Sequence, residues 1–124
     1  MNVLILALDA VIPAEVYDAD VLVVAPAVNS RLRHWLSDED DARRRAEARA
    51  AALVDRLERV GVHAEGRVGD ADPLLAIADA LPTFPADEIV IAAEAERADQ
   101  LLARAHDRFA LPVFRAGESL PRAA

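Results

Sequence analysis

Short runs of apolar residues alternate along this chain with helical patterns of apolar and polar residues. Residues 3–8 (VLILAL), 21–25 (VLVVA) and 89–93 (IVIAA) are apolar at every position. Continuous apolar runs of this length are typical of parallel strands that are covered on both faces. They predict the central strands of a parallel sheet.

Two further segments predict strands at the edges of this sheet. In residues 62–68, apolar or small residues alternate with His63, Glu65 and Arg67, which is the pattern of a strand with one solvated face. Residues 111–114 (LPVF) form a short apolar run, but Pro112 has no N–H to donate to a sheet. Both segments are therefore expected near an edge.

The longest predicted helix lies between residues 37 and 60. Ser37 and Asp40 have the spacing of a capping box, and Gly61 is a stop signal. The arginines around the helix alternate with acids, so we interpret them as a solvated face. Its apolar stripe consists of Ala46, Ala50, Leu53, Leu57 and Val60.

Two more helices are predicted at residues 73–81 and 95–109. Asp72 suits the N-cap of the first of them and Pro73 its first position. In the second, His106 lies next to the apolar stripe, so we expect it to be half-buried. The connection formed by residues 10–20 is short for a parallel crossover, which predicts a stunted first helix. The helix predicted at residues 73–81 has an apolar face of Leu74, Ile77, Ala78 and Leu81. The helix predicted at residues 95–109 has an apolar face of Ala98, Leu102, Ala105 and Phe109.

Together these elements predict one α/β domain over residues 1–116, followed by a loose tail at residues 117–124. The expected architecture is an open, mostly parallel five-stranded sheet with helices on both faces. A length of 124 residues suits one domain.

Composition narrows the possible functions. The 22 acidic and 14 basic residues give a net charge of −8, which disfavours nucleic acid and anionic membrane partners. The chain contains no Cys, and all its basic residues are Arg, so thiol chemistry and Lys-dependent phosphate or Schiff-base sites are excluded. Asp9 directly follows the first apolar run, which suits neither a signal peptide nor a membrane span. We therefore expect a cytoplasmic protein.

The segment from Gly69 to Ile91 resembles the universal stress protein family. It reads Gly-Asp-Ala-Asp-Pro after a strand, then a helix with Ile77 and Ala80, then Asp87 before the strand Ile89–Ile91. The resemblance runs from about residue 21 to residue 114, and residues 3–9 match the first strand of the family. It implies a Rossmann-like sheet of order 3-2-1-4-5, of the kind also found in adenine nucleotide alpha hydrolases.

The resemblance also implies a frequent homodimer, joined through the fifth strand. In this chain that strand contains Leu111, Val113 and Phe114.

Nucleotide-binding members of the family carry an Asp at the end of the first strand, and Asp9 occupies that place. They also have a phosphate loop of the form G-x2-G-x9-G-[ST] after the fourth strand. Here no glycine follows Ile91 until Gly117, and Glu94 and Glu96 add negative charge. Without glycines the backbone N–H groups do not close around a phosphate, so we predict that ATP is not bound in the family manner.

Ligands of open α/β sheets lie at the carboxyl ends of the central strands. This rule predicts a crevice bordered by Asp9, Pro26 and Glu94, near a basic cluster that includes Arg31 and Arg33. Asp9 and Glu94 alternatively have purely structural roles. Two acids are too few for a divalent cation site, and no serine lies in a nucleophile elbow.

Three functions remain for such a chain. The first is a non-catalytic binding or regulatory module that acts as a homodimer and needs no cofactor. The second is an ATP- or AMP-binding protein whose site is rebuilt from Asp9, Arg31, Arg33 and Arg97. The third is a small hydrolase, for which the sequence offers no catalytic constellation.

Overall fold

The computed structural model describes residues 1–9, 18–28 and 39–116. The predicted first helix, the basic cluster with Arg31 and Arg33, and the predicted capping residue Ser37 fall outside these ranges. In chain order, the described elements are β1 (Asn2–Ala7), β2 (Asp20–Pro26), α2 (Glu39–Arg59), β3 (Ala64–Gly69), α3 (Pro73–Ala80), β4 (Glu88–Ala92), α4 (Ala95–Arg108) and β5 (Val113–Arg115).

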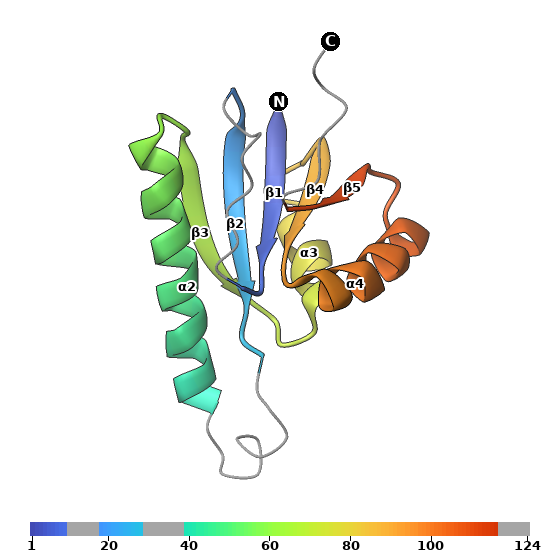
Figure 1. Cartoon of the computed structure of the whole chain (residues 1–124), viewed down its shortest axis with the longest axis horizontal. Coiled ribbons are helices and arrows are strands. Elements are labelled where there is room, and N and C mark those ends of the chain that lie inside the picture. Colours follow the sequence, from blue (N-terminus) through green and yellow to red (C-terminus); the bar gives the residue numbers. More distant parts are fainter. Residues whose placement is uncertain (10–17, 29–38, 117–124) are drawn as a thin grey trace.

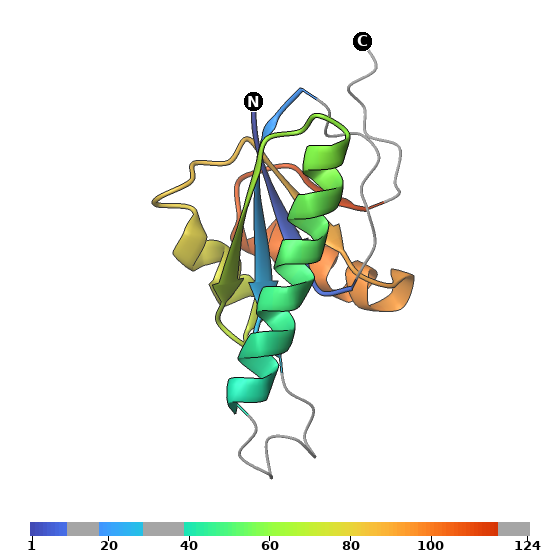
Figure 2. The same cartoon turned by 90° about the vertical axis from the view of Figure 1, so that its left-hand side faces the viewer.

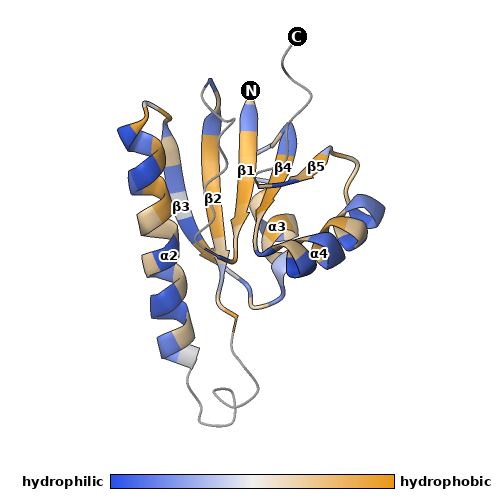
Figure 3. Ribbon diagram, in the orientation of Figure 1, coloured by the Kyte–Doolittle hydropathy of each residue, from blue (hydrophilic) through white to orange (hydrophobic). Residues whose placement is uncertain are grey.

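The five strands form one parallel sheet of order β3-β2-β1-β4-β5, as predicted (Figure 1). Strand β1 is central, with Val3 paired to Val21 of β2 and Leu4 paired to Ile89 of β4. The strands that have continuous apolar sequences are the inner ones, and Figure 3 shows them as the most hydrophobic ribbons. The alternating strand, β3, is at an edge, which confirms its prediction.

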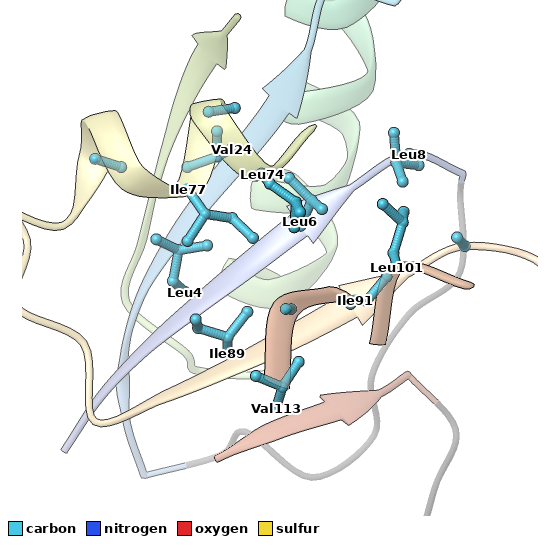
Figure 4. Packing of buried hydrophobic residues seen from close by; sticks show 14 of the residues in the cluster. Leu4, Leu6, Leu8, Val24, Leu74, Ile77, Ile89, Ile91, Leu101 and Val113 are labelled. Atoms are coloured by element: carbon cyan, nitrogen blue, oxygen red, sulfur yellow. The ribbon is translucent and has the colours of Figure 1, made fainter. Parts of the chain in front are cut away.

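Helices cover both faces of the sheet, also as predicted (Figure 2). Helix α2 packs on one face, where Ala46, Ala50 and Leu53 meet the side chains of β1 and β2. Helices α3 and α4 share the core on the other face. In Figure 4 this core brings Leu4, Leu6, Ile89 and Ile91 of the strands against Leu74, Ile77 and Leu101 of the helices.

Helix α2 follows its predicted stripe except at the end. Ala46, Ala50, Leu53 and Leu57 are buried, whereas the side chain of Val60 is 58% exposed. The helix ends at Arg59, and Gly61 has a φ of 85°, so the chain turns away before Val60 reaches the sheet. The prediction was wrong for Val60 and correct for the stop at Gly61.

Helix α3 begins as its sequence predicts. The Asp72 carboxylate accepts a hydrogen bond from the Leu74 N–H at 3.1 Å, and Pro73 is the first helical residue. Just before it, the Asp70 carboxylate accepts the Asp72 N–H at 2.9 Å. This contact gives Asp70 a structural role in the turn before α3.

In helix α4 the buried face lies slightly off the predicted stripe. Ala98, Leu101 and Ala105 are buried, whereas Leu102 is only partly buried. With Leu101 at the centre of the buried face, His106 turns toward solvent and is exposed. The prediction that His106 is half-buried was therefore wrong.

Candidate functional site

Strands β1, β2 and β4 all end on the same side of the sheet, and polar groups collect there. Of the residues predicted for this crevice, the structure places Asp9, Pro26 and Glu94 there. Arg31 and Arg33 belong to the part of the chain that is not described. The described part of the site consists of the strand ends and the helices that flank them.

Asp9 fixes the connection between β4 and α4. Its Oδ2 atom accepts a hydrogen bond from the Glu94 N–H at 2.8 Å. The N–H groups of Leu8 and Asp9 both donate to the carbonyl oxygen of Ala92, each at 3.0 Å. The end of β1 is thus tied to the end of β4 and to the first residue before α4.

Glu94 contributes to this arrangement through its backbone. It occupies the N-cap position of α4 with φ −61° and ψ 155°, but its side chain makes no capping hydrogen bond. Its carbonyl oxygen accepts the Ala98 N–H at 2.8 Å. The carboxylate of Glu94 is exposed and adds negative charge beside the helix N-terminus.

Arg49 is the site residue that the sequence analysis missed. It projects from α2 to the strand ends, where Nε donates to the Ala7 carbonyl and Nη2 donates to the Pro26 carbonyl, both at 2.8 Å. One guanidinium therefore joins the ends of β1 and β2. The interpretation of the α2 arginines as a solvated face was wrong for Arg49, which is half-buried.

The electrostatic surroundings of Arg49 place several charges near one another. Burial lowers the pKa of Arg49, and the negative charge of Asp9 partly offsets this by raising it. The nearby positive charges of Arg97 and Arg45 lower the pKa further. Three arginines and one aspartate thus lie within electrostatic reach at the strand ends.

Part of this positive charge is already neutralised. Arg45 forms an ion pair with Asp41 one turn earlier on α2. Arg49 uses Nε and Nη2 on carbonyl oxygens, which accept hydrogen bonds but carry no full charge. Arg97 is half-buried on α4, opposite α2 across the strand ends. Arginine N–H groups recognise carboxylates or phosphates, so the arginines at the strand ends are suited to contact an anion.

Within the described residues, no group of three or more His, Asp and Glu side chains is placed to hold a metal ion. Asp70 and Asp72 are neighbouring acids, but each accepts a backbone N–H in the turn that begins α3.

Two surface cavities lie along β3 rather than at the strand ends beside Asp9. One, of about 330 Å³, is lined in part by Arg67, Asp70, Ala76 and Asp79. The other, of about 460 Å³, lies between β3 and α2. Neither is lined by Asp9 or Arg49, so these hollows of the surface and the polar cluster are separate features.

Comparison with known proteins identifies the fold. No family model and no curated protein matches the sequence. Among solved structures, the chain matches a universal stress protein family protein from Arabidopsis thaliana, crystallised with AMP bound. The TM-score is 0.60 over 94% of this chain and 90% of that one.

This chain has the universal stress protein fold. Sequence identity to the Arabidopsis protein is 16%, so the likeness is one of architecture. It agrees with the resemblance of the Gly69–Ile91 segment and with the strand order of the sheet. None of the helices in the described ranges is long and apolar enough to cross a membrane. In this universal stress protein fold, Asp9 and Arg97 lie within electrostatic reach of Arg49 at the carboxyl ends of the central strands.

Proposed function

We propose that this chain is a non-catalytic binding or regulatory module with the universal stress protein fold, and that it does not bind ATP through a phosphate loop. The observation that carries the proposal is the bridge made by Arg49 between Ala7 and Pro26. The bridge lies at the carboxyl ends of β1 and β2, the side of an open α/β sheet on which ligands bind. A ligand that used these two carbonyl groups would have to displace a guanidinium that already makes charge-assisted hydrogen bonds.

The connection from β4 to α4 supports the same conclusion. A helix N-terminus binds phosphate through free backbone N–H groups. In this chain the Glu94 N–H already donates to the Asp9 carboxylate. Ala93 is buried, and the carboxylates of Glu94 and Glu96 repel a polyphosphate.

Calorimetric titration of the purified protein with Mg-ATP tests this proposal. We expect no binding heat up to millimolar nucleotide, both for the wild type and for Asp9→Ala. A micromolar dissociation constant for the wild type that Asp9→Ala abolishes would overturn the proposal.

A second function, the binding of AMP or ATP at a rebuilt site, is favoured by a different observation. The Arabidopsis protein, whose structure covers 94% of this chain, has AMP bound. Asp9 and Arg97 both lie within electrostatic reach of Arg49, and arginine N–H groups bind a monophosphate without needing a glycine loop. Arg31 and Arg33 remain predicted members of such a site.

Thermal shift measurements with AMP separate the two functions. Ligand at 100 times its dissociation constant stabilises a protein by about 2.7 kcal/mol, which gives a readily measured rise in Tm. The rebuilt site predicts this rise for the wild type, its loss in Arg97→Ala, and its retention in Arg104→Ala. Arg104 is the matched control because it is exposed on the same helix. The module proposal predicts no rise in Tm for any of the three proteins. The double variant Arg31→Ala/Arg33→Ala tests the contribution of the predicted basic cluster in the same assay.

We also propose that the module works as a homodimer. The sheet has two edges, β3 and β5, and an open edge favours pairing with another chain. The sequence predicted contact through Leu111, Val113 and Phe114. Sedimentation velocity over a dilution series tests self-association directly, and a mass that stays near 13.4 kDa at every concentration would contradict it.

A further inference from the structure

Strand β3 presents a long and regular edge. It pairs with β2 from Ala64 to Gly69 without a bulge, and the sheet order places it last on that side. Figure 2 views the sheet from this edge, and among the described elements none lies over the edge of β3 between α2 and α3. The strand lacks Pro, a residue with which proteins often protect an edge from pairing, and its two charges, Glu65 and Arg67, are of opposite sign.

The hydrogen bonds to β2 reveal which backbone groups face outward. The carbonyl oxygens of His63 and Gly69 accept the N–H groups of Val21 and Ala27, at 3.0 and 3.1 Å. Backbone groups alternate in direction along a strand, so the odd-numbered residues of β3 face β2. The N–H and C=O groups of Ala64, Gly66 and Val68 therefore point to the open edge.

This alternation limits how a second copy of β3 pairs in antiparallel orientation. The outward residues of the two copies must face one another, and the most extensive pairing then centres on Gly66. In that register Ala64 lies opposite Val68 of the other copy, and Glu65 lies opposite Arg67. A shift of the centre to residue 65 or 67 instead places Glu65 against Glu65 or Arg67 against Arg67, so charge selects the register at Gly66.

The side chains of this register are available for the contact. Glu65 and Arg67 are both exposed. They lie on the face away from α2, because a Cβ atom at Gly66 would point at Val54, 3.3 Å from its Cγ2. Arg67 donates from Nη1 to the Thr83 hydroxyl at 2.7 Å, which orients its guanidinium and leaves further N–H donors. Pairs such as these occupy the non-hydrogen-bonded positions of an antiparallel ladder, where opposite side chains come closest.

The face covered by α2 also has room for a second copy. The cavity of about 460 Å³ lies along β3 and is lined on its helical side by residues that include Ala50, Ala51 and Val54. These side chains are small, whereas Arg43 and Glu47, which also line this cavity, are long and charged. Gly66 places no side chain at the proposed two-fold axis, and the part of α2 next to it is Ala50 and Val54, so small residues lie beside the axis.

We propose that β3 is a self-association surface, at which two copies of this chain pair antiparallel about Gly66 and join their sheets. The two-fold axis makes the Glu65–Arg67 pair occur twice, in agreement with an isologous interface. The proposal rests on the homodimer proposed above and assigns its surface.

Charge reversal provides the test, by sedimentation velocity on the full chain. We expect Glu65→Arg and Arg67→Glu to weaken the dimer about 10- to 100-fold each, since each creates two like-charged pairs. The double variant Glu65→Arg/Arg67→Glu restores opposite charges and should dimerise like the wild type. An equimolar mixture of the two single variants should form a heterodimer, because one copy then carries arginine at both positions and the other carries glutamate at both.

Two controls distinguish pairing at β3 from a general effect of changed charge and from pairing at the β5 edge. Arg104→Glu reverses an exposed charge on α4, outside β3, so its dimer should be unchanged. Phe114→Arg probes the β5 edge. A dimer that survives both single reversals, or that only Phe114→Arg dissociates, overturns the β3 proposal but leaves the homodimer standing. A wild type that is monomeric throughout overturns both, and the nucleotide titrations stay independent of either result.

Discussion

Replacing Arg49 by Met tests the most distinctive contact of the structure. Methionine preserves much of the buried aliphatic stem but removes the two N–H donors. The carbonyl oxygens of Ala7 and Pro26 then lose partners that lie at 2.8 Å. We expect the variant to fold but to be clearly less stable.

The magnitude follows from three contributions. A hydrogen bond from a charged donor is worth about 1.5–3 kcal/mol, so the loss of both would cost about 3–6 kcal/mol if nothing compensated. Relief of the partly buried charge, whose desolvation lowers the pKa of Arg49, offsets part of this cost. Water at the strand ends can hydrate the carbonyl oxygens again. The expected net loss is about 2–3 kcal/mol in the free energy of unfolding.

Urea denaturation followed by circular dichroism measures this loss, with an unchanged m-value as the check on two-state unfolding. The matched control is Arg44→Met on the same helix. The Arg44 side chain is 73% exposed, and its ion pair with Asp41 is at 3.8 Å, so we expect a change of less than about 0.5 kcal/mol. Arg49→Lys should fall between the two, since an ammonium lacks the planar fork that reaches both carbonyls. Equal stabilities of Arg49→Met and Arg44→Met would refute the structural role of the bridge.

Two other pairs of substitutions test local contacts of the fold. Gly69→Ala places a Cβ atom 2.7 Å from the Ala76 Cβ and 2.9 Å from the Val24 Cγ1, so we expect the free energy of unfolding to fall by about 1–3 kcal/mol. In the control Gly66→Ala the new Cβ atom meets nothing closer than 3.3 Å, so the loss should be smaller. Equal losses in urea denaturation would contradict this packing. Asp72→Ala removes the N-cap of α3 and should lower the free energy of unfolding by about 1 kcal/mol. Its control is Asp79→Ala, which changes an exposed residue of the same helix. An Asp72→Ala protein as stable as the wild type would show that the cap contributes nothing.

Much of the fold was predictable because it depends on local rules. A strand that is apolar at every position needs cover on both faces, which places residues 3–7, 21–25 and 89–92 inside the sheet. The alternation in β3 tolerates one solvated face and so indicates an edge. Asp72 and Pro73 mark the start of α3 through a side-chain oxygen and a fixed φ, which need no distant partner.

The role of Arg49 could not be predicted in this way. Its acceptors are backbone carbonyls that lie 42 and 23 residues away in the sequence, and a carbonyl has no sequence signature. The only local signal is its position beside the stripe of Ala46, Ala50 and Leu53, where small neighbours let a long side chain bend toward the sheet. The same limit explains His106 and Val60, because the phase of a helix at its end depends on where the chain leaves it.

The structure also changes how the family-like residues of this chain are understood. At the amino end of the sheet, the Asn2 N–H donates to the Asp87 carboxylate at 2.8 Å, and the Asp87 N–H donates to the Asn2 carbonyl at 2.7 Å. At the carboxyl end, Asp9 accepts the Glu94 N–H. Asp87 and Asp9 thus join the same two strands, β1 and β4, at opposite ends. Each is accounted for by a contact within the chain, so their presence indicates the architecture and does not by itself indicate a nucleotide. Whether the strand ends bind an anion therefore depends on Arg49 and Arg97, and the AMP measurements with Arg97→Ala and Arg104→Ala address that question independently of the fold.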